Sequence, residues 1–305
     1  MVNQINDQNI ISIVTPSFQQ GEFLERTINS VITQEGNFYL DYIITDGGSK
    51  DNSVEIIKKY DRLILEGAEV LTHAGLVFRK VPSGTNESTN CLGISYRWVS
   101  EKDNGQTHAI NKGWKLAVGS VIAWLNSDDV YLPKALEKAY TTLSESDSTC
   151  IYGIGLHIDK EDRLLELYPI EPYSFLRLLD YCIICQPTVF LKREVLTSIG
   201  YLNESLGYCM DYEYWLRIAL KYPFSFLKET LACTRIHENT KTSQNLKVHS
   251  EIIQMQKKVV GKTSKHWLYH YSNYKLSELF PGWKGSVFLK VLIRIHSFIL
   301  GFTYR

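Results

Sequence analysis

The feature that most constrains the fold is a regular alternation, along the first half of the chain, of apolar β-branched runs with amphipathic segments. The apolar runs predict strands, and the segments with apolar residues three and four apart predict helices. The predicted strands are residues 10–16, 39–48, 94–101 and 120–129, and the predicted helices are residues 22–33, 53–60, 105–119 and 132–143. Repeated strand–helix–strand units favour an α/β fold, with a mostly parallel sheet flanked by helices and right-handed crossovers.

A polar cluster follows each of these strands at its carboxyl end. The clusters read TPSF, TDGGSKD, SEKDNGQ and NSDD. Parallel strands bring their carboxyl ends to one edge of the sheet, where ligands of open α/β sheets bind. The sequence therefore predicts one polar crevice built from four separate turns.

The NSDD cluster places two adjacent carboxylates, Asp128 and Asp129, at the exit of a buried strand. Like charges this close repel each other unless a cation or a donor-rich ligand lies between them. Carboxylate oxygens suit Mg²⁺ or Mn²⁺, which would in turn bind a diphosphate. The alternative is a pair of capping residues that leads into the helix at Pro133.

Three further carboxylates lie in the neighbouring turns. Asp46 directly follows an apolar strand, and Glu101 and Asp103 follow the next strand. These groups could accept hydrogen bonds from a base or a ribose, and the glycines after Asp46 would let backbone approach a ligand closely. A D-G-G sequence is also typical of a simple turn.

Composition excludes some partners. Lys+Arg and Asp+Glu are equal at 33 each, so no general basic field exists to bind nucleic acid. The six cysteines are scattered apart from Cys182 and Cys185, and no second C-x-x-C pair completes a zinc site, so buried reduced thiols are favoured over redox or metal chemistry. The N-terminal residues show no export signal, and we expect a cytoplasmic protein.

Two regions lie outside this pattern. Residues 61–92 lack clean periodicity and are expected to form an excursion, or a flap, at the sheet's edge. The apolar segment at residues 286–302 is shorter than the roughly 20 residues that span a bilayer. We expect a helix there that packs on the protein body or makes peripheral contact with a membrane, at its inner face.

Taken together and in order, these motifs resemble the family 2 glycosyltransferases, which build bacterial polysaccharides. The resemblance runs through residues 10–34, DGGSKDNS, residues 100–129, residues 186–206 and MDYEYWLRI, about two-thirds of the chain. It implies the GT-A (Rossmann-like) fold over residues 1–240, with a nucleotide-binding half at 1–130, an acceptor half at 131–240 and a helical C-terminal extension at 241–305. Two features depart from the family: Gly47 stands where another acidic residue is common, and the stretch at 61–92 is long.

The resemblance also implies roles for individual residues. Thr15, Pro16, Ser17 and Phe18 would line the nucleoside pocket, Asp46 and Asp103 would hold base and ribose, Asp128 would touch ribose or donor sugar, and Asp129 would bind the metal, Mn²⁺ or Mg²⁺. Arg235 and His237 would lie near the diphosphate, with His237 as a second metal ligand or as a surface histidine.

The implied reaction is an inverting transfer of a sugar from a nucleotide-diphosphate donor, with a UDP-sugar as the expected choice, to a hydroxyl of a glycan or lipid-linked acceptor. Asp211 matches the family's base, which takes the proton of the acceptor hydroxyl. Alternatively Asp211 only caps its helix, and Glu213 is the rival carboxylate. Two other functions stay open: a sugar-phosphate nucleotidyltransferase, although residues 15–23 carry no basic residue to grip a triphosphate, and an inactive carbohydrate-binding domain of the same fold.

Overall fold

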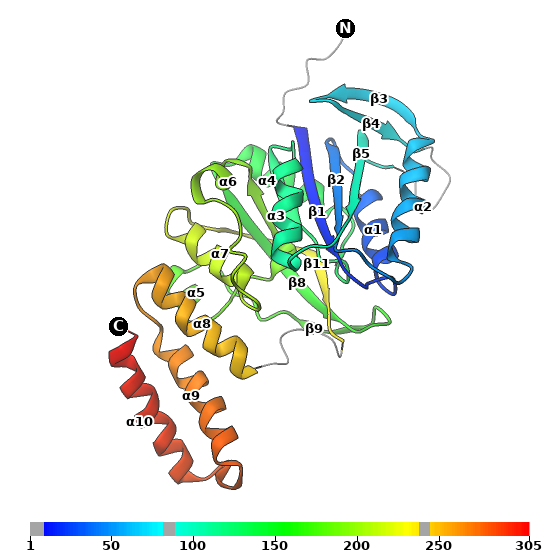
Figure 1. Cartoon of the computed structure of the whole chain (residues 1–305). Helices are drawn as coiled ribbons and strands as arrows, with labels where there is room; N and C mark the ends of the chain where they lie inside the picture. The colour runs from blue at the N-terminus through cyan, green and yellow to red at the C-terminus, as the bar shows by residue number, and fades with distance from the viewer. Residues whose placement is uncertain (1–8, 82–88, 238–244, 305) are drawn as a thin grey trace. The chain divides into compact units, whose positions relative to one another are not determined.

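The strand–helix alternation of the first half forms the centre of a large sheet. The computed structural model describes residues 9–81, 89–237 and 245–304. Its central strands are β1 (Ile10–Ser17), β2 (Tyr39–Asp46), β5 (Gly93–Ser100) and β6 (Val121–Trp124). They lie in the order β5-β2-β1-β6 and are all parallel. Figure 1 shows β5, β2 and β1 side by side. The α/β prediction with a parallel sheet is therefore confirmed for these four strands.

On one side of this centre a single strand, β10, runs against its two neighbours. β10 (Val189–Lys192) pairs antiparallel with both β6 and β8 (Cys150–Ile158), and β11 (Ser225–Arg235) pairs parallel with β8. Two reversals restore the direction, so β8 and β11 run the same way as β1. The short strands β7 (Val130–Tyr131) and β9 (Leu164–Leu167) add antiparallel pairs to β11 and β8.

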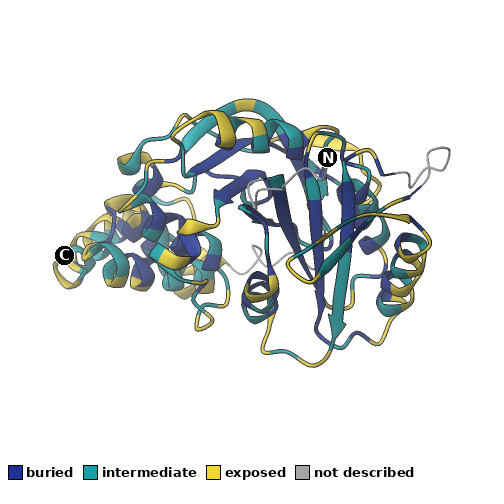
Figure 2. Cartoon of the chain, turned by 90° about the horizontal axis from the view of Figure 1, so that it is seen from above, coloured by how far each residue is buried: buried dark blue, intermediate teal, exposed yellow. Residues whose placement is uncertain are grey.

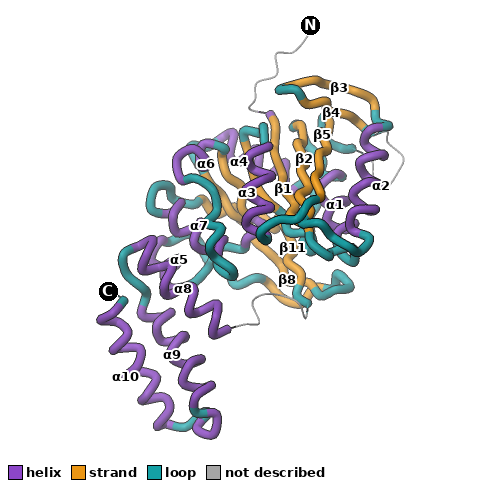
Figure 3. The backbone as a smooth tube through the Cα atoms, viewed as in Figure 1, coloured by secondary structure: helices purple, strands orange, loops and turns teal. Residues whose placement is uncertain are grey.

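The irregular stretch at residues 61–92 extends the opposite edge of the sheet. After α2 (Ser53–Leu65), β3 (Ala68–His73) and β4 (Leu76–Lys80) form an antiparallel hairpin, and β4 pairs with β5. The expected excursion at the sheet's edge is thus a hairpin (Figure 3). Residues 82–88, which belong to the stretch where a flap is expected, lie outside the described residues.

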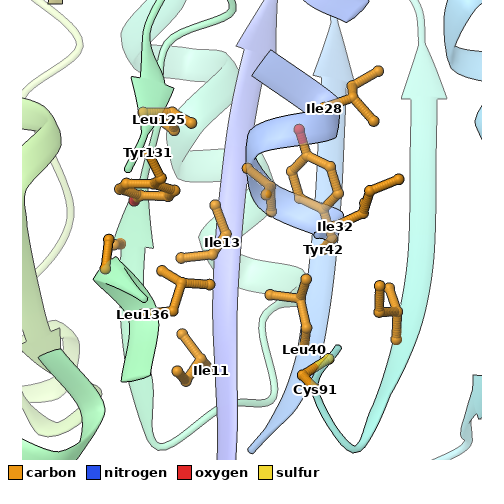
Figure 4. Packing of buried hydrophobic residues seen from close by; sticks show 14 of the residues in the cluster. Ile11, Ile13, Ile28, Ile32, Leu40, Tyr42, Cys91, Leu125, Tyr131 and Leu136 are labelled. Carbon is orange, nitrogen blue, oxygen red and sulfur yellow. The ribbon is translucent and has the colours of Figure 1, made fainter. Parts of the chain in front are cut away.

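Helices cover both faces of the sheet. α1 (Leu24–Ile32), α2 and α4 (Ala135–Glu145) pack their apolar residues with Ile11 and Ile13 of β1 in one core (Figure 4). Side chains alternate along a strand, so Val14 faces the other way, where α3 (Gln106–Leu116) approaches: a β-carbon on Gly113 would lie 2.4 Å from Val14 Cγ1. The helix α6 (Glu194–Ile199) follows β10. Figure 2 shows the buried central strands between more exposed helices.

The described residues divide into two compact units. The first holds every strand and consists of residues 1–170, 184–201 and 224–236; the second consists of residues 171–183, 202–223 and 237–305. Because the two units interleave along the chain, the predicted domain boundary at residue 240 stays a prediction.

The second unit is helical. Its helices are α5 (Phe175–Asp180), α7 (Met210–Ala219), α8 (Asn245–Val260), α9 (Lys265–Leu279) and α10 (Val287–Thr303). The carbonyl of Leu179 in α5 joins that helix to three others by accepting hydrogen bonds from Tyr212 Oη (3.0 Å), Gln256 Nε2 (2.6 Å) and Trp267 Nε1 (3.1 Å). The predicted helical extension is confirmed. None of the helices in the described ranges has the length and apolar content needed to cross a bilayer.

Candidate functional site

The carboxyl ends of the central strands lie level with one another, as the sequence predicts. In the register of the sheet, Ser17 of β1 lies beside Asp46 of β2, and Asp46 lies beside Ser100 of β5. The backbone stays paired just past the strands: Gly47 N donates to Ser17 O at 2.8 Å, and Glu101 N donates to Asp46 O at 3.0 Å. We call the turns at residues 15–21, 46–53, 100–106 and 125–130 the strand-end rim.

Side chains tie the first two turns of the strand-end rim together. Gln19 N donates to Ser49 Oγ at 2.8 Å, and Gln19 Oε1 accepts from the backbone N–H groups of Lys50 and Asp51. Gly21 N donates to a carboxylate oxygen of Asp51 at 2.8 Å. These bonds hold the two turns in a fixed relation before any ligand arrives, which lowers the ordering cost of binding.

Asp46 is an organiser of its own turn. Its carboxylate is 2 % exposed and accepts from Gly48 N, Ser49 N, Ser49 Oγ and Ser100 Oγ at 2.5 to 3.0 Å. Such a set of donors uses most of the acceptor capacity of a carboxylate. The predicted contact with a base or ribose stays a prediction, and the geometry gives Asp46 a role in shaping the turn.

Asp103 is the more accessible carboxylate of the strand-end rim. It accepts from Gly105 N at 2.8 Å through Oδ1, while Oδ2 lies against the bare backbone of Gly47. Phe18, 59 % exposed, lies beside the same point of Gly47. An exposed aromatic ring and a half-buried carboxylate that meet at a glycine suit the flat face and polar edge of a base.

Glu101 does not share this arrangement. It is exposed and forms an ion pair with Lys112 of α3. The hydrogen bond from Lys112 and its charge lower the pKa of Glu101. Its predicted ligand contact stays a prediction.

The end of β1 holds a buried hydroxyl that finds no partner within the described residues. Ser17 is 3 % exposed, and its Oγ makes no hydrogen bond. Its neighbour Pro16 is buried, and Thr15 Oγ1 lies 3.0 Å from Tyr42 Oη. Because a buried hydroxyl without a partner costs free energy, Ser17 Oγ is a candidate to contact a bound ligand.

The adjacent carboxylates of the fourth turn differ in exposure. Asp129 is 2 % exposed: Oδ1 accepts from Arg235 N at 3.0 Å, and Oδ2 accepts from Asn126 Nδ2 at 3.1 Å. Burial, and then repulsion from Asp128, raise the pKa of Asp129 well above its ordinary value. Asp128 is half-buried and therefore the more accessible of the two.

A chain of amide side chains, to which the sequence reading gave no role, lies beside this pair. Gln106 Nε2 donates to Asn126 Oδ1 at 2.7 Å, Asn126 Nδ2 donates to Gln186 Oε1 at 3.0 Å, and Gln186 Nε2 donates to Trp124 O at 3.0 Å. Gln186 starts the short helix η2 (Gln186–Thr188), some 60 residues along the chain. The QPTVF motif could have indicated it, but no single residue in it suggests chemistry.

Arg235 holds the fourth turn in place. Its side chain is fully buried and donates to Asp128 O (2.9 Å), Asp159 O (2.6 Å) and Asp162 Oδ1 (2.5 Å). Its guanidinium also lies 5.0 Å from the centre of the Phe23 ring. The role predicted near a diphosphate stays a prediction, while these contacts make Arg235 a positioning residue for Asp128 and Asp129.

The carboxylate pair fits a divalent cation that is shared with a ligand. No three His, Cys, Asp or Glu side chains gather into a metal-binding group in the described ranges. Mg²⁺ and Mn²⁺, however, are commonly held by one or two carboxylates together with substrate phosphates rather than by a full protein cage. Two adjacent carboxylates, one with its pKa raised by burial and by the charge of the other, suit such an ion.

Asp211 lies in the second unit, in the first turn of α7. The N-cap of α7 is Cys209, and Asp211 Oδ1 accepts from Tyr212 N at 2.7 Å. Asp211 is half-buried, whereas Glu213 is 4 % exposed and ion-paired with Arg217 at 2.9 Å. Of the two, Asp211 is the carboxylate that a substrate can reach.

Glu251 of α8, which the sequence reading missed, fixes the entry of α7. Its carboxylate accepts from the backbone N–H groups of Gly207, Tyr208 and Cys209 at 2.7 to 2.8 Å. A carboxylate at a helix N-terminus satisfies unpaired N–H groups and interacts favourably with the helix dipole. No sequence signal links Glu251 to residues more than 40 positions earlier.

His237 is half-buried and follows the last strand. The residue before it, Ile236, donates its N–H to Ile158 O at 2.9 Å. The predicted metal-ligand role of His237 stays a prediction. The six cysteines are free thiols. Cys185 is buried, as expected, whereas Cys182 is only half-buried.

The fold and the strand-end rim define an α/β protein of the class whose ligand crevice lies at the carboxyl ends of its strands. The sequence model described as Glycosyl transferase family 2 matches residues 12–75 and 86–197. The chain therefore belongs to family 2 of the glycosyltransferases, and the resemblance noted in the sequence is confirmed.

Relatives found by sequence similarity include several glycosyltransferases. An uncharacterized glycosyltransferase of Methanocaldococcus jannaschii is 24 % identical over 268 residues, which cover 86 % of this chain and 82 % of the relative. Chondroitin synthase of Escherichia coli is 23 % identical over 244 residues, covering 79 % of this chain. The chain spans only 31 % of chondroitin synthase and 36 % of a glycosyltransferase of Rickettsia conorii.

Solved structures share the fold. Residues 1–349 of Staphylococcus aureus TarS, in complex with UDP-GlcNAc, superpose with a TM-score of 0.59 at 16 % identity, over 91 % of this chain and 76 % of that one. The mannosyltransferase PcManGT of Pyrobaculum calidifontis, in complex with GDP-Man and Mn²⁺, gives a TM-score of 0.59 at 12 % identity, over 95 % and 79 %. The GT-A fold prediction is confirmed.

Proposed function

We propose that this glycosyltransferase moves a sugar from a UDP-sugar, with inversion, to a hydroxyl of a glycan or lipid-linked acceptor. The observation that carries the proposal is the strand-end rim. It presents an exposed ring at Phe18, a carboxylate at Asp103, an orphan hydroxyl at Ser17 and a carboxylate pair at Asp128 and Asp129 on one sheet edge. Base, ribose and diphosphate need groups of these kinds.

The carboxylates Asp128 and Asp129 would hold Mn²⁺ or Mg²⁺ together with the diphosphate, with His237 as a further ligand. When bound, such an ion neutralises charge on the departing nucleoside diphosphate. The Mn²⁺ in PcManGT with GDP-Man supports a divalent ion here. Arg235, by fixing the backbone of Asp128, keeps both carboxylates in position.

Asp211 would act as the general base. The acceptor oxygen attacks the anomeric carbon from the face opposite the diphosphate, the new C–O bond forms as the bond from carbon to phosphate oxygen breaks, and the hydroxyl proton passes to Asp211. Holding the donor and acceptor side by side would supply much of the rate. The half-buried position of Asp211 at the start of α7 supports this role.

The expected setting is the synthesis of a cell-surface polysaccharide in the cytoplasm. The likeness to chondroitin synthase supports polysaccharide synthesis, the UDP-GlcNAc complex of TarS supports a UDP-sugar, and six free thiols suit a reducing compartment.

A panel of nucleotide-sugars tests the proposal without a known acceptor. With Mn²⁺, the protein should release nucleoside diphosphate slowly from one donor by transfer to water, and chelation by EDTA should stop the release. Pyrophosphate release from a nucleoside triphosphate and a sugar phosphate would instead show a nucleotidyltransferase. Failure to bind any nucleotide in calorimetry would leave only a binding domain of this fold.

A further inference from the structure

The last helix, α10, uses only one of its sides inside the protein. Leu289 and Ile293 are 3 % and 2 % exposed, and α10 packs beside α9 (Figure 1). His296 Nδ1 lies 2.8 Å from Ser272 Oγ of α9 on the same side. Packing on the protein, one of the two outcomes expected from the sequence, thus explains one side of the helix and not the other.

The other side of α10 is a row of exposed apolar side chains. Its members are between 46 % and 77 % exposed: Val287, Phe288, Val291, Ile295, Phe298, Ile299 and Phe302. At 100° per residue these seven positions fall within an arc of about 120°. We call this row the α10 stripe. An exposed apolar surface of this length marks an interaction site.

Aromatic rings continue the α10 stripe at the turn before the helix. Phe280 and Trp283 stack at 4.9 Å, and Trp283 meets Phe288 edge-on at 4.9 Å. Trp283 is 43 % exposed. Exposed Trp and Phe beside an apolar helix face are typical of segments at the boundary between lipid and water.

The charge around the α10 stripe selects the partner. Residues 279–304 contain Lys284, Lys290 and Arg294 and no acidic residue, although the whole chain has a net charge of zero. All three basic residues are exposed, and the helical positions of Lys290 and Arg294 border the α10 stripe on one side. Anionic phosphates complement this edge, whereas a second copy of the helix would bring like charges together.

We propose that α10 lies in the plane of a membrane that contains anionic lipid, with the α10 stripe in the acyl boundary and Lys284, Lys290 and Arg294 at the headgroup phosphates. At 17 residues α10 is about 26 Å long, which suits a helix in the interface plane. The proposal states where the protein works and does not depend on the sugar-transfer reaction.

Co-sedimentation of the whole chain with vesicles tests this surface. We expect the protein to sediment with vesicles of phosphatidylcholine mixed with phosphatidylglycerol, and to bind vesicles of phosphatidylcholine alone at least about tenfold more weakly. The double variant Phe298→Ser/Phe302→Ser should lose at least about tenfold in binding to the mixed vesicles. The double variant Lys290→Glu/Arg294→Glu should lose binding to the mixed vesicles and not to the neutral ones.

A matched control changes two apolar side chains that are exposed elsewhere, Leu65→Ser/Leu116→Ser, and should bind as the wild type does. The proposal is overturned if the wild type stays in the supernatant with the mixed vesicles, or if the Phe298→Ser/Phe302→Ser variant sediments as fully as the wild type. It is equally overturned if the wild type is a dimer without vesicle affinity and this variant is a monomer. Calorimetry with UDP on each variant reports the strand-end rim separately.

Discussion

The backbone of Gly47 lies so close to Asp103 that a β-carbon on Gly47 would be 2.8 Å from Asp103 Oδ2 and 3.2 Å from Phe18 Cδ2. The resemblance to the family suggests an acidic residue at this position, and here such a side chain would meet the Asp103 carboxylate unless Asp103 moved. The absence of a side chain at Gly47 lets the Asp103 carboxylate lie against the turn.

Gly47→Ala should therefore disturb the strand-end rim and leave the fold intact. The obstacle that the new methyl group meets is the end of a side chain, so Asp103 moves aside and the free energy of unfolding changes by less than about 1 kcal/mol. The affinity for UDP should fall about tenfold, or about 1.4 kcal/mol. Calorimetry and urea denaturation measure the two effects.

Gly282→Ala is the matched control, because a β-carbon there would meet nothing within 4 Å. It should leave both quantities unchanged. If Gly47→Ala binds UDP as tightly as the wild type, Asp103 has no role in nucleotide binding.

Arg235→Ala should destabilise the protein severely. The substitution leaves the carbonyls of Asp128 and Asp159 without their buried donor, so we expect a loss of about 3 kcal/mol in the free energy of unfolding. UDP binding in the presence of Mn²⁺ should weaken as well, since the turn that holds Asp128 loses its support.

Arg163→Ala provides the comparison, since Arg163 also pairs with Asp159 but is 74 % exposed. Its loss should cost less than about 1 kcal/mol. Equal losses in the two variants, measured by urea denaturation, would contradict the positioning role of Arg235.

Asp211→Asn should abolish transfer and preserve donor binding. Asparagine has the same shape and can still accept the hydrogen bond from Tyr212 N, but it cannot take a proton. The rate of sugar transfer should fall by about 10²- to 10⁴-fold with the UDP affinity unchanged. Turnover and calorimetry on the same sample check both.

Glu213→Gln tests whether Glu213, rather than Asp211, is the general base. Glu213 is buried against Arg217, so its substitution should lower stability and leave the transfer rate of the folded fraction near that of the wild type. An active Asp211→Asn enzyme, together with an inactive Glu213→Gln enzyme, would move the base to Glu213.

Glu251→Gln should change how stability depends on pH. Burial alone would raise the pKa of Glu251, but hydrogen bonds from Gly207, Cys209 and Tyr208 outweigh it and hold the pKa below 4.5. A carboxyl whose pKa is lower in the folded state stabilises the fold above its unfolded pKa, and this contribution is lost as the pH falls through the folded pKa.

The wild type should therefore exceed Glu251→Gln by about 1 kcal/mol near pH 7, and this difference should shrink steadily below about pH 4.5. Denaturation with urea across this range measures it. The exposed Glu278 gives the control Glu278→Gln, which should follow the wild type. A difference that stays constant down to about pH 3 would show that the charge of Glu251 has no such role.

Local patterns predicted the central strands and their polar ends because each strand carries its own apolar run and its own turn. The same patterns could not show that the Asp46 carboxylate accepts hydrogen bonds from Ser49 and Ser100, because those bonds depend on how the turns meet in space. Arg235 was assigned to a ligand for the same reason: its partners Asp128 and Asp159 are more than 70 residues away.

The excursion at the sheet's edge was predicted, but its two strands β3 and β4 were not, because most of β3 is exposed and the pair carries little periodicity. Gln186 and Glu251 were missed because amide and carboxylate side chains on unremarkable segments give no signal until their partners are known.

The fourth turn of the strand-end rim is held in place by hydrogen bonds from residues that are far from it along the chain. Thr27 binds the carbonyl of Asp129, and Arg235 binds its carboxylate, across separations of 102 and 106 positions. Contacts of such long range close slowly, after local structure has formed. A growing polypeptide can thus assemble its early strands long before the fourth turn is in place, and the ordering of that turn would report that the last strand has docked.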